Sequence, residues 1–287
     1  MAQQVCDYVV LGGSGLVGRY ILDKLAQTDA RGVVVSRIRP NLPSGFEWVQ
    51  TSDLLSGAYQ LPAANCILST WPIWLLGDTI DKFKGARQLI GLSTASVISK
   101  RDSADRTERD FATRIAQSEA RVQTAARASG MTYTLYRPTI IYDGAADQSI
   151  SLIAKIIRRF GFFAVAGRGR GLRQPVHAGD VAEAVLRSVD HPGVANQTFF
   201  VTGGETLDYR AFVRRIAESQ GMPPRIIAVP GFVLRWAVHL MRHLGWTTVS
   251  PSLVDRMNED LAFDGSEVVE RLGFHPRGFS PRPDLTH

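Results

Sequence analysis

The sequence is poor in cysteine and has no long apolar run. Its two cysteines, Cys6 and Cys66, lie among apolar residues and form no CxxC pair, which excludes thiolate zinc sites and dithiol redox chemistry. No apolar run reaches the roughly 18 to 20 residues of a membrane-spanning helix, so we expect no integral membrane contact. A strand predicted from Asp7 leaves no room for a signal peptide. We therefore expect a soluble, cytoplasmic protein with reduced thiols.

Acidic residues are absent between Asp147 and Asp180, although the chain of 287 residues carries a net charge of only +6. The basic residues of this stretch are Lys155, Arg158, Arg159, Arg168, Arg170 and Arg173. Such a concentration of positive charge attracts phosphate or carboxylate groups. Because no nucleic-acid-binding motif accompanies it, we expect an anionic small molecule as partner and no nucleic acid.

Short apolar runs alternate with helical patterns in the first half of the chain. Strands are predicted at 7–11, 32–35, 46–49, 66–68, 88–92 and 132–135, with a long helix at 109–129. This alternation predicts an α/β fold with a doubly wound parallel sheet. Later segments predict a helix at 150–160, a Gly/Arg loop at 161–171, a helix at 180–189 and a strand at 198–201. From 207 onward only helices and loops are predicted.

Three glycines, Gly12, Gly15 and Gly18, follow the first predicted strand and precede a helix. This position and spacing are typical of a Rossmann-type dinucleotide site, where glycine lets the backbone turn tightly and approach a pyrophosphate. The helix N-terminus then offers free N–H groups to the phosphate, with Ser14 and Leu16 as further contacts. A turn with a purely structural purpose is the alternative.

The end of the second strand indicates which dinucleotide would bind. It carries Ser36 and Arg37, and no acid follows before Glu47. A carboxylate at this point would bind the ribose hydroxyl of NAD, whereas arginine can pair with the 2′-phosphate of NADP. The sequence therefore favours NADP(H), with NAD(H) as the alternative. Asp53, after the third strand, is placed to meet the adenine.

Four segments together resemble the short-chain dehydrogenase/reductase superfamily, in its extended or atypical, epimerase/dehydratase-like branch. They are the glycine turn, Leu92-Ser93-Thr94-Ala95-Ser96-Val97, Tyr136-Arg137-Pro138-Thr139-Ile140-Ile141-Tyr142, and the segment from Gln174 to Ala182. The resemblance covers nearly the whole chain. It implies an NAD(P)-binding Rossmann domain over 1–204, with part of the substrate cleft at 143–176, and a small, mostly helical, substrate-capping lobe over 205–287. It also implies that Ser69 and Pro138 contact the cofactor.

The catalytic pattern of that superfamily is incomplete here. Its members use a Ser or Thr, which Thr94 matches, and a Tyr and Lys in the pattern YxxxK. Gapless counting places Ile115 and Glu119 at the Tyr and Lys positions. Either Lys100 or Tyr142 supplies the proton, in an oxidoreductase or epimerase/dehydratase, or the protein is a sensor or assembly factor that binds the dinucleotide without turnover. The literal YxxxK from Tyr20 to Lys24 lies on the helix after the glycine turn and is rejected.

On the substrate side, the resemblance assigns Arg168, Arg170, Arg173 and His177 to an anionic substrate such as a nucleotide sugar. The arginine fork binds two phosphate oxygens at once, although a solvated basic loop would have the same sequence. His239 and His243 lie four apart without a third ligand, so we expect no metal. The long helix at 109–129 raises the expectation of a homodimer.

The apolar segment 231–244 also carries basic residues. It is compatible with an anionic membrane surface or with packing over the substrate cleft.

Overall fold

The computed structural model describes residues 5–83, 85–143, 148–245 and 251–281. The chain divides into two compact units, each assembled from separate segments. Unit 1 comprises Met1–Pro138, Ala178–Val201 and Asp264–His275, and unit 2 comprises Thr139–His177, Thr202–Phe263 and Pro276–His287. The segment 143–176, which the sequence assigned to the first domain, therefore clusters with most of the tail.

Unit 1 is built on a parallel sheet of seven strands in the order β11-β6-β5-β4-β1-β2-β3. The strands are β1 (Cys6–Leu11), β2 (Gly32–Ser36), β3 (Phe46–Gln50), β4 (Ala64–Ser69), β5 (Gln88–Leu92), β6 (Thr132–Pro138) and β11 (Gln197–Val201). Every residue of β2 and β5 is buried, as expected for parallel strands covered on both faces. The strand order reverses beside β1, the point at which doubly wound folds bind their ligands. The predicted fold class is confirmed.

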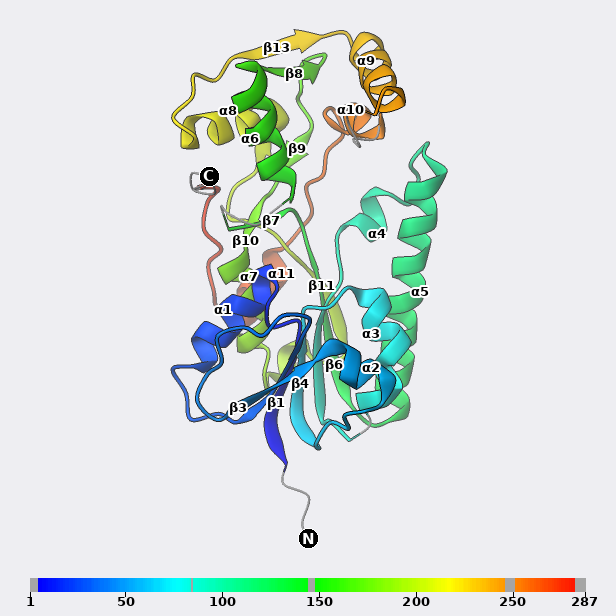
Figure 1. The fold of residues 1–287 in the computed structure, drawn as a ribbon, viewed down its shortest axis with the longest axis vertical. Coiled ribbons are helices and arrows are strands. Elements are labelled where there is room, and N and C mark those ends of the chain that lie inside the picture. Colours follow the sequence, from blue (N-terminus) through cyan, green and yellow to red (C-terminus); the bar gives the residue numbers. More distant parts are fainter. Residues whose placement is uncertain (1–4, 84, 144–147, 246–250, 282–287) are drawn as a thin grey trace. The chain divides into compact units, whose positions relative to one another are not determined.

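Helices cover both faces of this sheet (Figure 1). On one face, α1 (Leu16–Leu25) packs against α7 (Ala178–Arg187), which also contacts α11 (Ser266–Leu272). On the other, α3 (Ile73–Thr79) packs against α5 (Arg106–Ala128). The shorter helices of unit 1 are α2 (Thr51–Ser56), α4 (Ser96–Ser99) and the 3-10 turns Ile80–Phe83 and Pro192–Val194. The long predicted helix is thus confirmed as α5, whose first turn is capped by the Asp105 side chain.

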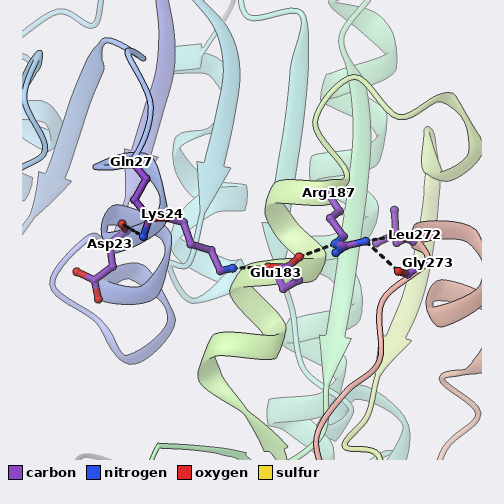
Figure 2. A network of polar contacts seen from close by, with 7 residues as sticks. All are labelled: Asp23, Lys24, Gln27, Glu183, Arg187, Leu272 and Gly273. Carbon is purple, nitrogen blue, oxygen red and sulfur yellow. Dashed lines mark hydrogen bonds and ion pairs between the residues drawn. The ribbon is translucent and has the colours of Figure 1, made fainter.

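A chain of polar contacts joins α1, α7 and α11 (Figure 2). The Lys24 ammonium contacts the carboxylate of Glu183, which also accepts a hydrogen bond from Arg187 Nε. Arg187 in turn donates to the carbonyl oxygens of Leu272 and Gly273, at 3.1 and 2.9 Å. These contacts lower the pKa of Glu183, chiefly through the hydrogen bond from Lys24.

Unit 2 combines helices with short strand pairs. Its strands are β7 (Ile141–Tyr142), β8 (Phe163–Ala166), β9 (Leu172–Arg173), β10 (Val176–His177), β12 (Leu207–Asp208) and β13 (Ile226–Val229). They pair as β7 with β10, β8 with β13, and β9 with β12. Its helices are α6 (Gln148–Phe160), α8 (Tyr209–Ser219), α9 (Gly231–His243) and α10 (Ser252–Arg256).

Two predictions for this unit were wrong. The expected loop at 161–171 contains β8, and the expected strand-free tail contains β12 and β13. These strands are only two to four residues long. They exist because each finds a partner far along the chain, which no local pattern reveals.

Within the described part of the chain, no helix combines the length and the apolarity needed to span a bilayer.

Candidate functional site

The glycine turn follows β1 at the reversal point of the sheet. Gly12 has φ +90°, and a Cβ there would lie 2.4 Å from Thr70 Oγ1. A Cβ on Gly18 would lie 2.2 Å from the carbonyl oxygen of Gly12. Both positions therefore exclude every larger residue for reasons internal to the protein.

Gly15 is different from the other two glycines. It is exposed with φ −79°, a conformation any residue adopts, and a Cβ there would lie 3.1 Å from the Gly12 carbonyl oxygen. A small side chain at this position needs the Gly12 carbonyl to shift by only a few tenths of an ångström, a much milder clash than at Gly12 or Gly18. Because Gly15 has no side chain, its backbone is accessible to a bound pyrophosphate. Ser14 and Leu16, on either side, are half-buried.

The N-terminus of α1 has neither a side-chain cap nor an acidic residue in its first turn. The helices α3 and α9 share both features, whereas α5 and α8 are capped by the side chains of Asp105 and Asp208, so the glycine turn that precedes α1 is what distinguishes it. The first N–H groups of a helix have no partner within it, and they carry the positive end of the helix dipole. The residues present therefore fit an anionic group such as a pyrophosphate at the start of α1.

The strands beside β1 bring further candidates to the same edge of the sheet. Ser69 ends β4, and its Oγ is buried without a hydrogen-bond partner among the described residues. Ser36 ends β2, where its Oγ donates to the Ile38 carbonyl at 2.6 Å and accepts from Trp48 Nε1 at 3.0 Å. These bonds fix the backbone that carries Arg37, whose side chain is exposed. Asp53 is exposed in the first turn of α2.

Thr94 lies just beyond β5, where the resemblance places it. The side chain is half-buried, and its Oγ1 accepts a hydrogen bond from the Ser96 amide at 3.2 Å. The neighbouring Ala95 amide donates to the carbonyl of Pro138 at 3.0 Å, which joins this turn to the end of β6. The Thr94 hydroxyl hydrogen remains available to a ligand oxygen.

Ile115 and Glu119, to which the resemblance assigns the positions of Tyr and Lys, both belong to the packing of α5. Ile115 is fully buried in the sheet core, and Glu119 is buried at 3% exposure. The Glu119 carboxylate receives two hydrogen bonds from Arg137, one of them from Nε at 2.9 Å, and a third from Ser93 Oγ. Neither position can therefore perform the chemistry of a tyrosine or lysine.

The network of Ser93, Glu119 and Arg137 was missed from the sequence. A signal for it exists: Ala112, Ile115, Glu119 and Val122 recur at helical spacing, so an acid falls on the buried face of α5. A buried acid needs a cationic partner, and Arg137 on the adjoining strand β6 supplies it.

Lys100 follows the short helix α4 in unit 1, on the same connection as Thr94. Its ammonium lies 3.9 Å from Glu108 Oε1 and 4.8 Å from the centre of the Phe111 ring. The side chain is 22% exposed, so Lys100 packs against α5 and is only partly open to solvent.

Tyr142 and His177 belong to unit 2, where their adjacent strands pair in register. Tyr142 is fully buried, and its hydroxyl donates to the Gly278 carbonyl and accepts from the Ser280 amide, both at 3.1 Å. The His177 ring packs edge-on against it at 5.3 Å and is also buried. These contacts give Tyr142 a packing role that is complete without substrate.

The three arginines that the resemblance assigns to the substrate differ in environment. Arg173 is 3% exposed, stacks over Tyr209, and donates to the carbonyls of Leu172, Glu259 and Arg256. Burial lowers its pKa from the ordinary value. Arg168 and Arg170 are exposed. The loop that carries them is held by Asn258, which the sequence did not single out and which bonds Gly169 N and the Ala166 carbonyl.

The literal YxxxK at Tyr20 to Lys24 belongs to α1, where Lys24 is engaged by Glu183 (Figure 2). Among the described residues, no group of three or more His, Cys, Asp or Glu side chains is arranged to hold a metal ion.

The sequence of the chain is similar to those of known proteins over part of its length. No protein-family model matches the chain. A UDP-glucose 4-epimerase of Vibrio cholerae is 24% identical over 169 residues, which cover 59% of this chain and 49% of that protein. A 4-hydroxy-2-methyl-3-oxo-4-farnesyl-3,4-dihydroquinoline-1-oxide ketoreductase of Stigmatella aurantiaca is 29% identical over 136 residues, 47% of this chain and 40% of that protein. The matches thus span half or less of the length of these relatives.

Solved structures match over a much larger share of the chain. The UDP-glucose 4-epimerase of Thermotoga maritima, solved with UDP-glucose, has a TM-score of 0.65 at 16% identity and covers 94% of this chain and 93% of that one. The dTDP-glucose 4,6-dehydratase of Bacillus anthracis, solved with NAD, has a TM-score of 0.66 at 13% identity and covers 96% and 93%.

The protein is therefore a Rossmann-type α/β protein with a glycine turn at the reversal point of its sheet. More narrowly, it has the fold of the solved UDP-glucose 4-epimerase and dTDP-glucose 4,6-dehydratase, as the resemblance of the four sequence segments implied.

Proposed function

We propose that this chain binds a nicotinamide dinucleotide at the turn from Gly12 to Gly18, with NADP(H) preferred to NAD(H). The observation that carries the proposal is the uncapped start of α1 beside Gly15, a glycine that is exposed and whose replacement the fold opposes less than at Gly12 or Gly18. The preference rests on Arg37, exposed directly after β2 where no acid is present. Relatives of the same fold solved with NAD support the dinucleotide.

We further propose that the bound dinucleotide serves an oxidoreductase or epimerase/dehydratase acting on an anionic substrate, with a nucleotide sugar as the leading class. The nicotinamide would supply hydride transfer. Thr94 would hold the substrate oxygen through its hydroxyl hydrogen, and the Lys100 ammonium would donate the proton. Within unit 2, the exposed side chains of Arg168 and Arg170 are suited to bind phosphate or carboxylate groups. The related UDP-glucose epimerases support this substrate class.

A second candidate is dinucleotide binding without turnover, as in a redox sensor or assembly factor. Ile115 and Glu119, both buried where the superfamily has its Tyr and Lys, favour it. The enzyme and the sensor would use the same cofactor site, but only the enzyme would need Lys100 as a proton donor. Turnover of a nucleotide sugar that is lost in Lys100→Ala supports the enzyme; binding of NADPH with no turnover of any sugar nucleotide supports the sensor.

The cofactor site is tested by NADPH fluorescence titration of Gly15→Asp. A carboxylate about 4 Å from a phosphate, at an effective dielectric constant of about 20, costs roughly 4 kcal/mol, so we expect affinity to fall at least about a hundredfold. Gln27→Asp, at the opposite end of α1, adds the same charge and should leave affinity unchanged. Equal affinity of the Gly15→Asp variant and the unaltered protein would refute the site.

A further inference from the structure

Helix α9 exposes a band of large apolar side chains. The exposed fractions are 76% for Phe232, 41% for Val233, 68% for Trp236, 41% for Leu240 and 50% for Leu244, which directly follows the helix. Residues four apart lie above one another on a helix, so this band forms one continuous stripe. Exposed aromatic residues in such a stripe are uncommon on a soluble surface and indicate an interaction site.

The stripe is not the face by which α9 is held in unit 2. Val238 is buried, and Leu234 and Met241 pack against the core of that unit. The helix lies against β8 and α10 on this side (Figure 1). The helix is therefore apolar on two sides, and only the side with Leu234, Val238 and Met241 packs against the core of unit 2.

Charge indicates what covers the other side. No acidic residue occurs between Gly231 and Gly245, whereas His239, Arg242 and His243 are exposed beside the stripe. Arg235 is paired with Asp255 at 2.7 Å. Elsewhere in unit 2, the last turn of α6 carries Arg159 next to Phe160, which is 61% exposed. Apolar aromatic residues flanked by arginines match a bilayer interface rich in anionic headgroups.

We propose that α9 docks the protein on an anionic lipid surface, lying in the plane of the interface with Phe232 and Trp236 inserted. The helix is too short to span a bilayer and is anchored to unit 2 by its other side, so the contact is peripheral. The segment from Gly231 to Gly245 offers exposed Arg242 and no acidic residue to a second copy of the chain, which disfavours self-association.

Flotation of the full chain with phosphatidylcholine vesicles, with and without phosphatidylglycerol, tests the proposal. We expect binding to the anionic vesicles that weakens as salt is raised. Burial of one large aromatic side chain corresponds to about a tenfold change in partitioning, so Trp236→Ser should weaken binding about tenfold and Phe232→Ser/Trp236→Ser about a hundredfold. Both side chains are exposed, so the variants should fold.

Matched control variants test whether the effect depends on the position of the substitution in α9 or only on the type of residue removed. Leu55→Ser removes an exposed apolar side chain from α2 and should bind as the unaltered chain does. Arg242→Ser should weaken binding to anionic vesicles more than Arg106→Ser, which removes the same charge from an exposed position on α5. Absence of flotation, or flotation that Trp236→Ser does not change, would overturn the proposal. So would a dimer in sedimentation velocity that Trp236→Ser dissociates while vesicles are not bound.

Discussion

The buried ion pair of Glu119 and Arg137 gives the most specific prediction about the stability of the protein. Glu119 is the residue to which the resemblance assigns the position of a lysine. Replacing Glu119 by Gln keeps the shape of the side chain and removes its charge. The Arg137 guanidinium then loses its carboxylate partner while its side chain remains mostly enclosed, at 22% exposure. The effect on the free energy of unfolding follows from that geometry.

Breaking a fully buried ion pair costs about 3 to 5 kcal/mol, because the remaining charge is left without compensation. Water reaches part of Arg137, so we expect Glu119→Gln to cost about 3 kcal/mol, at the lower end of this range. Arg137→Met alone leaves the Glu119 carboxylate buried and should cost at least as much. The double variant should be less destabilised than the sum of the two, with a coupling of about 2 kcal/mol.

Urea denaturation of the four proteins measures these values, provided that the slope with denaturant is the same in all of them. Additive effects, or a cost below about 1 kcal/mol for Glu119→Gln, would refute the account. Glu119 would then be available for chemistry. Its interpretation as a structural residue at the position of the family's lysine would have to be reconsidered.

Three further variants test separate parts of the structure. Gly18→Ala should destabilise by about 3 kcal/mol or more because its Cβ meets a backbone oxygen at 2.2 Å, whereas Gly15→Ala should cost about 1 kcal/mol or less in the same urea titration. Glu183→Gln should cost about 1 kcal/mol at neutral pH. Because the folded protein lowers the pKa of Glu183, this difference should be lost as the pH falls below about 4, and a difference that persists in acid would contradict the assignment. Tyr142→Phe removes two hydrogen bonds of a fully buried side chain to the backbone of the exposed residues Gly278 and Ser280 and should cost about 1 kcal/mol by thermal unfolding; retention of full stability would show that its hydroxyl bonds are weak.

The sheet could be predicted from the sequence because each of its strands has a local signature. Val33, Val34 and Val35 form a continuous apolar run, and the glycines after Leu11 mark the turn into α1. Unit 2 lacks such signatures. The strand from Phe163 to Ala166 forms only through its pairing with Ile226 to Val229, which no window of sequence contains.

The candidate site divides in the same way. The positions of Gly15, Arg37 and Thr94 follow from short motifs at strand ends, which sequence reveals. The environments of Arg173 and Tyr142 depend on backbone groups distant in the chain, such as the Glu259 and Gly278 carbonyls. Periodicity locates a residue on a face, but only the folded chain decides whether its polar atoms are already satisfied.

We expect the open glycine turn, together with Arg37 after β2, to bind a phosphorylated nicotinamide dinucleotide. The first experiment is titration calorimetry of the full chain with NADPH, NADP⁺, NADH and NAD⁺, with Arg37→Glu as the matched variant. We expect binding of the NADP pair in preference to the NAD pair, and a shift toward NAD in Arg37→Glu. Binding of none of the four would contradict the claim and would leave the turn as a feature of the fold alone.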